Sequence, residues 1–234
     1  MKALATGFAL LGLLVFTNAR ADQPDQPFRL LAFGGQTVKW GKAGPGHGAR
    51  VTYALATDIM RFPHARNCDE IGSITSLLAG SGISFVEFER ELVAAFAMWE
   101  AAANITFVKT DDTTTAGILI GAQHVPKDRA FANVTHRESQ GPMAEIERAL
   151  ICLNPAVRWK LQFDGNFDVY DLRYTLAHEI GHAIGLDHPP QARVLMSYKY
   201  GEQFRELQRG DLAGAAALYG NRKVGRADSL PAVK

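Results

Sequence analysis

Apolar side chains recur at helical spacing after Ser84. The apolar positions lie three or four residues apart, on one face of a helix: Phe85, Phe88, Leu92, Phe96 and Trp99. Ser84 and Glu87 form an S-x-x-E capping box at the start, and Asn104 follows the last apolar position. Such an aromatic face is typical of a core helix, so we assign no chemistry to it.

A second helical pattern begins after Asp171, which is a suitable N-cap residue. Its apolar positions repeat every four residues: Leu172, Leu176, Ile180 and Ile184. Gly185 follows, and glycine adopts the left-handed conformation that ends a helix and turns the chain back. We therefore predict a helix with one buried face that stops at this glycine.

Other apolar runs predict strands. The β-branched and aromatic alternation of residues 50–55 indicates the first strand. Residues 117–121 are apolar throughout, which is typical of a strand inside a sheet. Further strands are predicted at residues 105–108 and 149–154. Residues 41–48 form a glycine-rich flexible run, and residues 67–82 are predicted to be an irregular insertion.

The start of the chain has the features of a secretory signal over residues 1–21. Lys2 supplies a positive charge, residues 4–16 are apolar, and residues 19–21 give an A-x-A cleavage site. The apolar run is too short for a typical transmembrane helix, although an uncleaved anchor is the alternative. We expect a secreted or periplasmic protein without a membrane anchor after cleavage. An N-terminal extension is predicted at residues 22–48, one domain at residues 49–221, and a polar tail at residues 222–234.

Charge gives no indication of an anionic partner. The chain holds 25 basic and 24 acidic residues, a net charge of +1. Neither nucleic acid nor an anionic membrane surface is indicated by this balance. We expect a monomer.

The chemistry is concentrated in residues 178–188, which read H-E-x-x-H-x-x-G-x-x-H. Residues four apart share a helix face, so His178 and His182 can present imidazoles to one point. The turn at Gly185 would bring His188 round as a third ligand. Three protein ligands leave a fourth position for water, the arrangement of a catalytic zinc site. Glu179, beside the first histidine, is placed to handle the protons of that water.

These residues, together with Met196, resemble the metzincin metalloproteases, in which a methionine turn lies under the zinc. The likeness is nearest the matrixin branch, because of the spacing from His188 to Met196 and a matrixin-like closing helix at residues 207–220. Pro189 and the run Met196-Ser197-Tyr198 are similar to the serralysin version. The resemblance implies an α+β catalytic domain: a twisted, mostly parallel sheet of about five strands, an active-site helix and a C-terminal helix. It also implies a zinc endopeptidase acting on proteins or peptides.

The resemblance assigns roles to further residues. Residues 129–134 match the matrixin edge strand that pairs with substrate. Tyr198 matches a serralysin tyrosine that approaches the metal and then the oxyanion, and the alternative is a tyrosine packed in the turn. Tyr174 matches a position that shortens the pocket for the side chain after the scissile bond, and Tyr200 matches the outer wall of that pocket. A small pocket is the resulting expectation.

Beyond one catalytic zinc, further metal sites have weak support. Matrixins hold a second, structural zinc with histidines near the edge strand, but Phe131 stands at one of those places. His124, Asp128 and His136 are the remaining candidates, and we expect no second zinc. Residues 164–168 begin like a calcium loop but lack the glycine and glutamate of an EF-hand. We interpret them mainly as a polar turn, with calcium left open.

The two cysteines, Cys68 and Cys152, would meet an oxidising compartment after export, which favours a single disulfide. The alternative is a latency cysteine that caps the zinc, as in matrixin pro-segments. The surroundings of Cys68, R-N-C-D, do not match that motif.

Two other functions stay open at this point. An exported zinc-binding interaction module would keep the histidines without needing Glu179. A protease restricted to one partner protein would be largely inactive on general substrates. The presence of Glu179 favours catalysis.

Overall fold

The computed structural model describes residues 27–190 and 193–222. The predicted signal at residues 1–21 lies outside these residues, as does nearly all of the predicted tail. Within the described part the helices are α1 (Thr75–Ser81), α2 (Phe85–Ala102), α3 (Leu172–Ala183) and α4 (Arg209–Tyr219). The strands are β1 (Arg29–Leu30), β2 (Ala32–Phe33), β3 (Gln36–Lys39), β4 (Ala49–Leu55), β5 (Met60–Arg61), β6 (Glu70–Gly72), β7 (Ile105–Lys109), β8 (Ile118–Gln123), β9 (Ala130–Arg137), β10 (Met143–Leu153), β11 (Trp159–Lys160), β12 (Tyr170–Asp171) and β13 (Leu186–Asp187).

The centre of the fold is a mostly parallel sheet. Strand β10 pairs in parallel with β8, β8 with β4, and β4 with β7. Strand β9 is antiparallel to β10 and has no other partner strand among the described residues. Short strands extend this sheet to nine. The predicted fold, a mostly parallel sheet with an active-site helix and a C-terminal helix, is confirmed.

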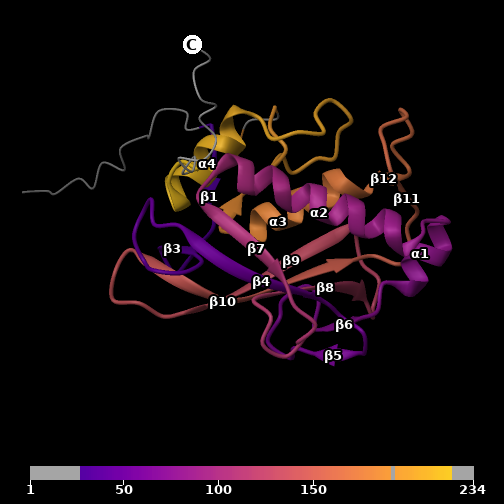
Figure 1. The fold of residues 1–234 in the computed structure, drawn as a ribbon, viewed down its shortest axis with the longest axis horizontal. Coiled ribbons are helices and arrows are strands. Elements are labelled where there is room, and N and C mark those ends of the chain that lie inside the picture. The colour runs from indigo at the N-terminus through magenta and orange to yellow at the C-terminus, as the bar shows by residue number, and fades with distance from the viewer. Residues whose placement is uncertain (1–26, 191–192, 223–234) are drawn as a thin grey trace, which may run out of the picture.

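Helices α2 and α3 cover one face of the sheet, and the short β5–β6 hairpin joins the sheet through pairing of β6 with β8 (Figure 1). Helix α2 begins with the predicted capping box between Ser84 and Glu87. Four of the five predicted apolar positions are buried: Phe88, Leu92, Phe96 and Trp99. The prediction for Phe85 is wrong, because this first-turn side chain is 49% exposed. None of the described helices has the length and apolarity to cross a bilayer.

Strands before residue 49 were missed. Residues 50–55 are not the first strand, because β3 joins the same sheet, with Val38 opposite Ala144 on β10. Strand β1 pairs with β13, directly before the third histidine of the motif. Strands of two to four residues are too short to show a period, which is why the pattern did not reveal them. The domain division at residue 48 itself stays a prediction.

The segment predicted as an irregular insertion is partly regular, since it contains β6 and α1. It also carries the disulfide between Cys68 and Cys152, which confirms that prediction. Both sulfurs lie in a small apolar cluster with Ile71, Leu119 and Leu150, separate from the main core. A cysteine in this disulfide has no free thiolate to cap a metal, so the latency alternative is wrong.

Lys39 on β3 gives a prediction about pH. Its side chain is fully buried, and its Nζ donates to the carbonyls of Trp40 (2.7 Å) and Lys42 (3.0 Å). Burial lowers the pKa of Lys39 to about 8, against the attraction of Glu145. An unfolded lysine titrates near pH ~10.4, so between these values the unfolded chain binds a proton that the folded chain does not. Stability due to Lys39 therefore rises with pH through this window.

We expect wild type to gain about 1–2 kcal/mol of unfolding free energy relative to Lys39→Met between pH 7 and pH 10. Denaturant titrations at several pH values measure this difference. Lys127→Met, which removes an exposed charge, is the control and should show little change. A difference between wild type and Lys39→Met that stays constant over the range would contradict the prediction.

Candidate metal and catalytic site

The active-site helix α3 is fixed at both ends. Asp171 is its N-cap, accepting from the Tyr174 backbone N–H at 2.8 Å. All four predicted apolar positions are buried: Leu172, Leu176, Ile180 and Ile184. Gly185 has φ +102°, and a Cβ there would lie 2.2 Å from the Val38 carbonyl oxygen. Only glycine fits this turn, which sends the chain back toward the helix.

Three aromatic side chains donate hydrogen bonds to backbone carbonyls of α3 and of its C-cap residue. The Trp40 indole donates to Ala183 O (2.8 Å), and the Tyr219 hydroxyl donates to Ile184 O (2.7 Å). These are carbonyls at the helix end, which lack partners inside the helix. Trp99 from α2 donates to Ala177 O at 2.9 Å. Residues 40 and 219, far apart in the sequence, thus hold the turn that precedes the third histidine.

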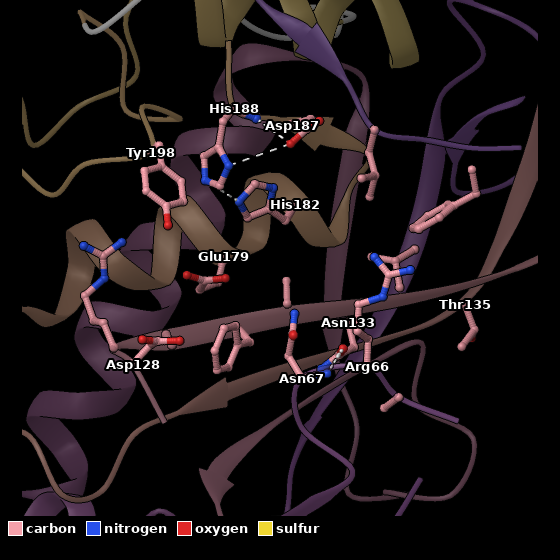
Figure 2. A pocket seen from close by; sticks show the side chains of 18 of the residues that line it. Arg66, Asn67, Asp128, Asn133, Thr135, Glu179, His182, Asp187, His188 and Tyr198 are labelled. Atoms are coloured by element: carbon pink, nitrogen blue, oxygen red, sulfur yellow. Dashed lines mark hydrogen bonds and ion pairs between the residues drawn. The ribbon is translucent and has the colours of Figure 1, made fainter. Parts of the chain in front are cut away.

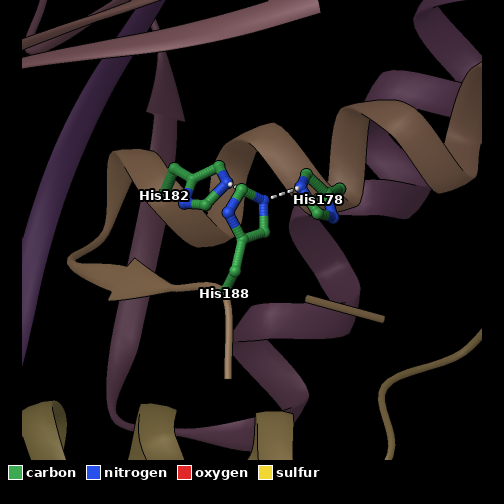
Figure 3. Close-up of side chains that lie close together, drawn as sticks. All are labelled: His178, His182 and His188. Carbon is green, nitrogen blue, oxygen red and sulfur yellow. Dashed lines mark hydrogen bonds between the residues drawn. The ribbon is translucent and has the colours of Figure 1, made fainter. Parts of the chain in front are cut away.

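The structure brings the three predicted ligands together (Figure 3). The Nε2 atom of His188 lies 3.1 Å from Nε2 of His178 and 3.1 Å from Nε2 of His182. A tetrahedral zinc with Zn–N bonds of about 2.0–2.1 Å separates its nitrogens by about 3.3 Å. The spacing of the three imidazoles therefore fits a zinc ion.

The protonation states also suit metal binding. Nδ1 of His178 lies 2.9 Å from Leu195 O, and Nδ1 of His182 lies 2.8 Å from Leu186 O. Carbonyl oxygens only accept, so both Nδ1 atoms carry the proton and both Nε2 atoms offer a lone pair. Burial lowers the pKa of His182 to about 4 and lowers that of His178 well below its usual range. Neutral imidazoles are the form that binds a metal.

Glu179 faces the same cavity as His182 and His188 (Figure 2). Its side chain is buried. Burial raises the pKa of the Glu179 carboxyl to about 7. The positive charge of Arg129 and a hydrogen bond from the Ala132 backbone partly offset this rise. A carboxylate with a pKa near neutrality can both accept and release a proton, as a general base and acid must.

Met196 packs beneath the histidines. A Cβ at Gly181 on α3 would lie 2.2 Å from the Met196 sulfur, so the glycine between the two helical histidines makes room for this side chain. The turn is held by Asp211, which accepts from the backbone N–H groups of Leu195 (2.8 Å) and Met196 (3.1 Å). Met196 therefore supports the site by packing.

Tyr198 stands at the cavity mouth. Its ring is perpendicular to that of His188, with centroids 5.1 Å apart, and Tyr198 is 77% exposed. The alternative of a tyrosine packed in the turn is therefore wrong. The role of Tyr198 in catalysis stays a prediction.

The two tyrosines predicted to frame a pocket are packed together. Tyr174 and Tyr200 meet edge to face with centroids 5.2 Å apart, and the Tyr174 hydroxyl donates to Leu195 O. Tyr200 donates to Glu202 and accepts from the Asp171 N–H. Neither lines the cavity, which has a volume of about 650 Å³.

Two features of the cavity wall were not predicted. Arg129 was included in the predicted edge strand, but its side chain was not expected to line the cavity, and residues 64–67, which precede the disulfide cysteine, were not expected there either. The Asn67 N–H donates to Asn133 Oδ1 on β9 at 3.1 Å, which fastens this segment beside the edge strand. A single charged residue at a strand start gives no periodic signal. The predicted disulfide at Cys68 was the one sequence feature that could have pointed to the second part.

The other metal candidates lie apart. His124 pairs with Glu70, and His136 stacks on Phe33. Asp128 is an exposed residue with φ 48°. Within the described ranges, the histidine triad is the only group of side chains arranged to hold a metal ion.

The segment that begins like a calcium loop, residues 164–168, binds a lysine. Asp164 and the Asn166 carbonyl accept from the Lys160 ammonium, and Glu202 pairs with it as well. The turn thus places its oxygens around a lysine.

These features together define a metzincin-type domain. Its helix bears two imidazoles and a carboxylate, a third imidazole follows a glycine turn, and a methionine turn lies beneath them. Comparison with known proteins identifies the branch. The Matrixin family model matches residues 80–220, and the chain belongs to the matrixin family.

Individual relatives agree. The chain is 31% identical to metalloendoproteinase 1-MMP of Arabidopsis thaliana over 147 residues, covering 58% of this chain and 39% of the relative. It is 28% identical to matrix metalloproteinase-23 of Bos taurus over 195 residues, covering 77% and 49%. It is 40% identical to matrix metalloproteinase-19 of Mus musculus over 149 residues, covering 61% and 27%. The chain thus spans less than half the length of these relatives.

Proposed function

We propose that this chain is a secreted zinc-dependent endopeptidase that hydrolyses peptide bonds of protein or peptide substrates. The observation that carries the proposal is the convergence of three Nε2 atoms beside a buried carboxylate in one cavity. His178, His182 and His188 would hold the zinc. When bound, the metal supplies Lewis acidity toward water and the substrate carbonyl.

The protein groups then act on the protons. Glu179 takes a proton from the water whose oxygen bonds to the scissile carbonyl carbon, and it delivers this proton to the nitrogen as the C–N bond breaks, so that nitrogen leaves as an amine and not as an anion. The unpaired edge of β9 offers backbone N–H and C=O groups to an extended peptide. Such pairing would align the scissile carbonyl with the cavity. Membership of a peptidase family and the geometry of these groups support this reading.

A metal-removal experiment tests the proposal. The exported form is purified, its zinc content is measured, and cleavage of a mixed peptide library is followed by mass spectrometry. We expect one zinc per chain, a loss of cleavage of at least about 100-fold with a chelator, and recovery when zinc is restored. A chain that binds zinc but cleaves neither library peptides nor candidate partner proteins would instead be an interaction module.

A further inference from the structure

The guanidinium of Arg129 has an unusual environment for a partly buried charge. Its Cζ lies 5.5 Å from the ring centroid of Tyr170 and 5.4 Å from that of Tyr200. Its Nε is buried and has no hydrogen-bond partner. Across residues 27–190 and 193–222, no carboxylate forms an ion pair with it. Two aromatic rings lie against the group, while its buried Nε donor has no acceptor among the described residues.

The Nε of the partly buried Arg148 also lacks a partner, but both of its Nη groups donate to backbone carbonyls, of Thr113 and Thr114. Two further partly buried arginines are paired with carboxylates. Arg205 donates from Nε to both carboxylate oxygens of Asp171 at 3.1 Å and from Nη2 to Glu91. Arg173 donates to Glu91 at 2.6 Å. An arginine that only supports the fold is normally satisfied in this way, because buried donors without acceptors are costly. The unpaired Nε donor of Arg129 therefore indicates a ligand.

The position of Arg129 ties that ligand to the site. The residue lines the same cavity as Glu179, His182 and His188. Arg129 also lies against Tyr200, which was predicted as the outer wall of the pocket for the side chain after the scissile bond but does not itself line the cavity. The guanidinium thus belongs to the cavity of the reacting groups and packs against Tyr200 beside it.

We propose that Arg129 receives a substrate carboxylate at the residue that follows the scissile bond, so that the enzyme cleaves before acidic residues. This inference rests on the proposed endopeptidase function. A guanidinium fixed between aromatic rings can bind a carboxylate through two parallel hydrogen bonds. The carboxylate comes either from an aspartate or glutamate side chain or from the free C-terminus of a short substrate.

Matched substrates test the proposal. Peptides identical except after the cleaved bond carry Asp, Asn, Glu or Gln there, and a further pair ends at that residue with a free or amidated C-terminus. We expect the zinc-loaded chain to favour the acids over their amides by roughly 10- to 100-fold in kcat/KM. A preference only for the free C-terminus would identify that carboxylate as the source and support Arg129 as its binding group.

Variants assign the preference to the residue. Arg129→Gln should bring the acid-to-amide ratio to about 1, and Arg129→Lys should retain part of it because the charge remains. Arg50→Gln removes an exposed arginine on β4 and should leave the ratio unchanged. If Arg129 only stabilised the fold, its replacement would lower kcat/KM for acidic and amide substrates equally and would not change their ratio.

Binding separates this inference from the proposed function. Fluorescence anisotropy with labelled acidic and amide peptides is measured on the zinc-loaded Glu179→Gln variant, which needs no turnover. If wild type cleaves nothing, the endopeptidase proposal fails, but acid-selective binding lost in Arg129→Gln would still support the carboxylate site. Equal binding and equal cleavage of acids and amides would overturn the inference.

Discussion

Glu179→Gln should lower kcat/KM for peptide cleavage by at least about 1,000-fold while one zinc stays bound per chain. Glutamine has nearly the same shape but cannot take a proton from water or pass it to the amine. The histidines keep their positions, because their Nδ1 atoms are oriented by Leu195 O and Leu186 O and do not depend on Glu179. Activity and metal content should therefore separate in this variant.

The measurement pairs steady-state kinetics with zinc analysis on the same sample. Glu147→Gln is the matched control, since this exposed carboxylate on β10 pairs only with Arg137 and lies outside the cavity. It should cleave as wild type does. Glu179→Gln retaining more than a tenth of wild-type activity would exclude this carboxylate as the proton carrier and point to another group.

The local spacing of the motif predicted most of the site. His178 and His182 lie one helical turn apart, so a helix alone sets their relation, and Gly185 indicated where the chain turns toward His188. The cap at Asp171 and the buried face of α3 followed from the same short-range rules. These features depend on residues within about four positions of each other, where sequence patterns are most informative.

What the sequence did not predict depends on long-range packing. Strand β3 joins the sheet through β10, more than 100 residues later, and its four residues show no period. Arg129 is notable only because Tyr170 and Tyr200 come to lie beside it. The oxygens of residues 164–168 bind Lys160, a partner that no calcium-loop pattern includes. Each relation exists only once the chain has folded.

The cavity itself combines both kinds of information. Its floor, with Glu179 and the histidines, comes from the local motif. Its opposite wall comes from β9 and residues 64–67, which the disulfide and the Asn67–Asn133 hydrogen bond hold in place. Chemistry in this protein is therefore encoded locally, while the shape that selects a substrate is set by distant contacts.

Asp211 is the residue outside the cavity whose loss should be most damaging. Its side chain is 1% exposed and accepts three backbone N–H groups, from Leu195, Met196 and Gln208. Burial raises the pKa of this carboxyl, and the three donors oppose the rise. Leu195 in turn presents the carbonyl that orients His178. One carboxylate therefore connects the start of α4 to a metal ligand.

Asp211→Ala should lower the free energy of unfolding by about 3–5 kcal/mol, because three buried donors lose their acceptor and a cavity remains. The same change should weaken zinc binding by about 10- to 100-fold, since the turn that positions His178 is loosened. Denaturant titrations with and without chelator measure the first effect, and competition with a metal-binding dye measures the second.

Asp211→Asn removes the charge and one acceptor oxygen but keeps the other oxygen and nearly the same volume, so it grades the loss without opening a cavity. It should lose about half as much stability as the alanine variant. Asp112→Ala is the control for a carboxylate that also accepts several donors, from Thr114 and Thr115, but lies exposed in a loop away from the site. Its loss should be much smaller and should leave zinc affinity unchanged. If Asp211→Ala bound zinc as tightly as wild type, the orientation of His178 would be set by α3 alone, and the Met196 turn would serve the fold rather than the metal.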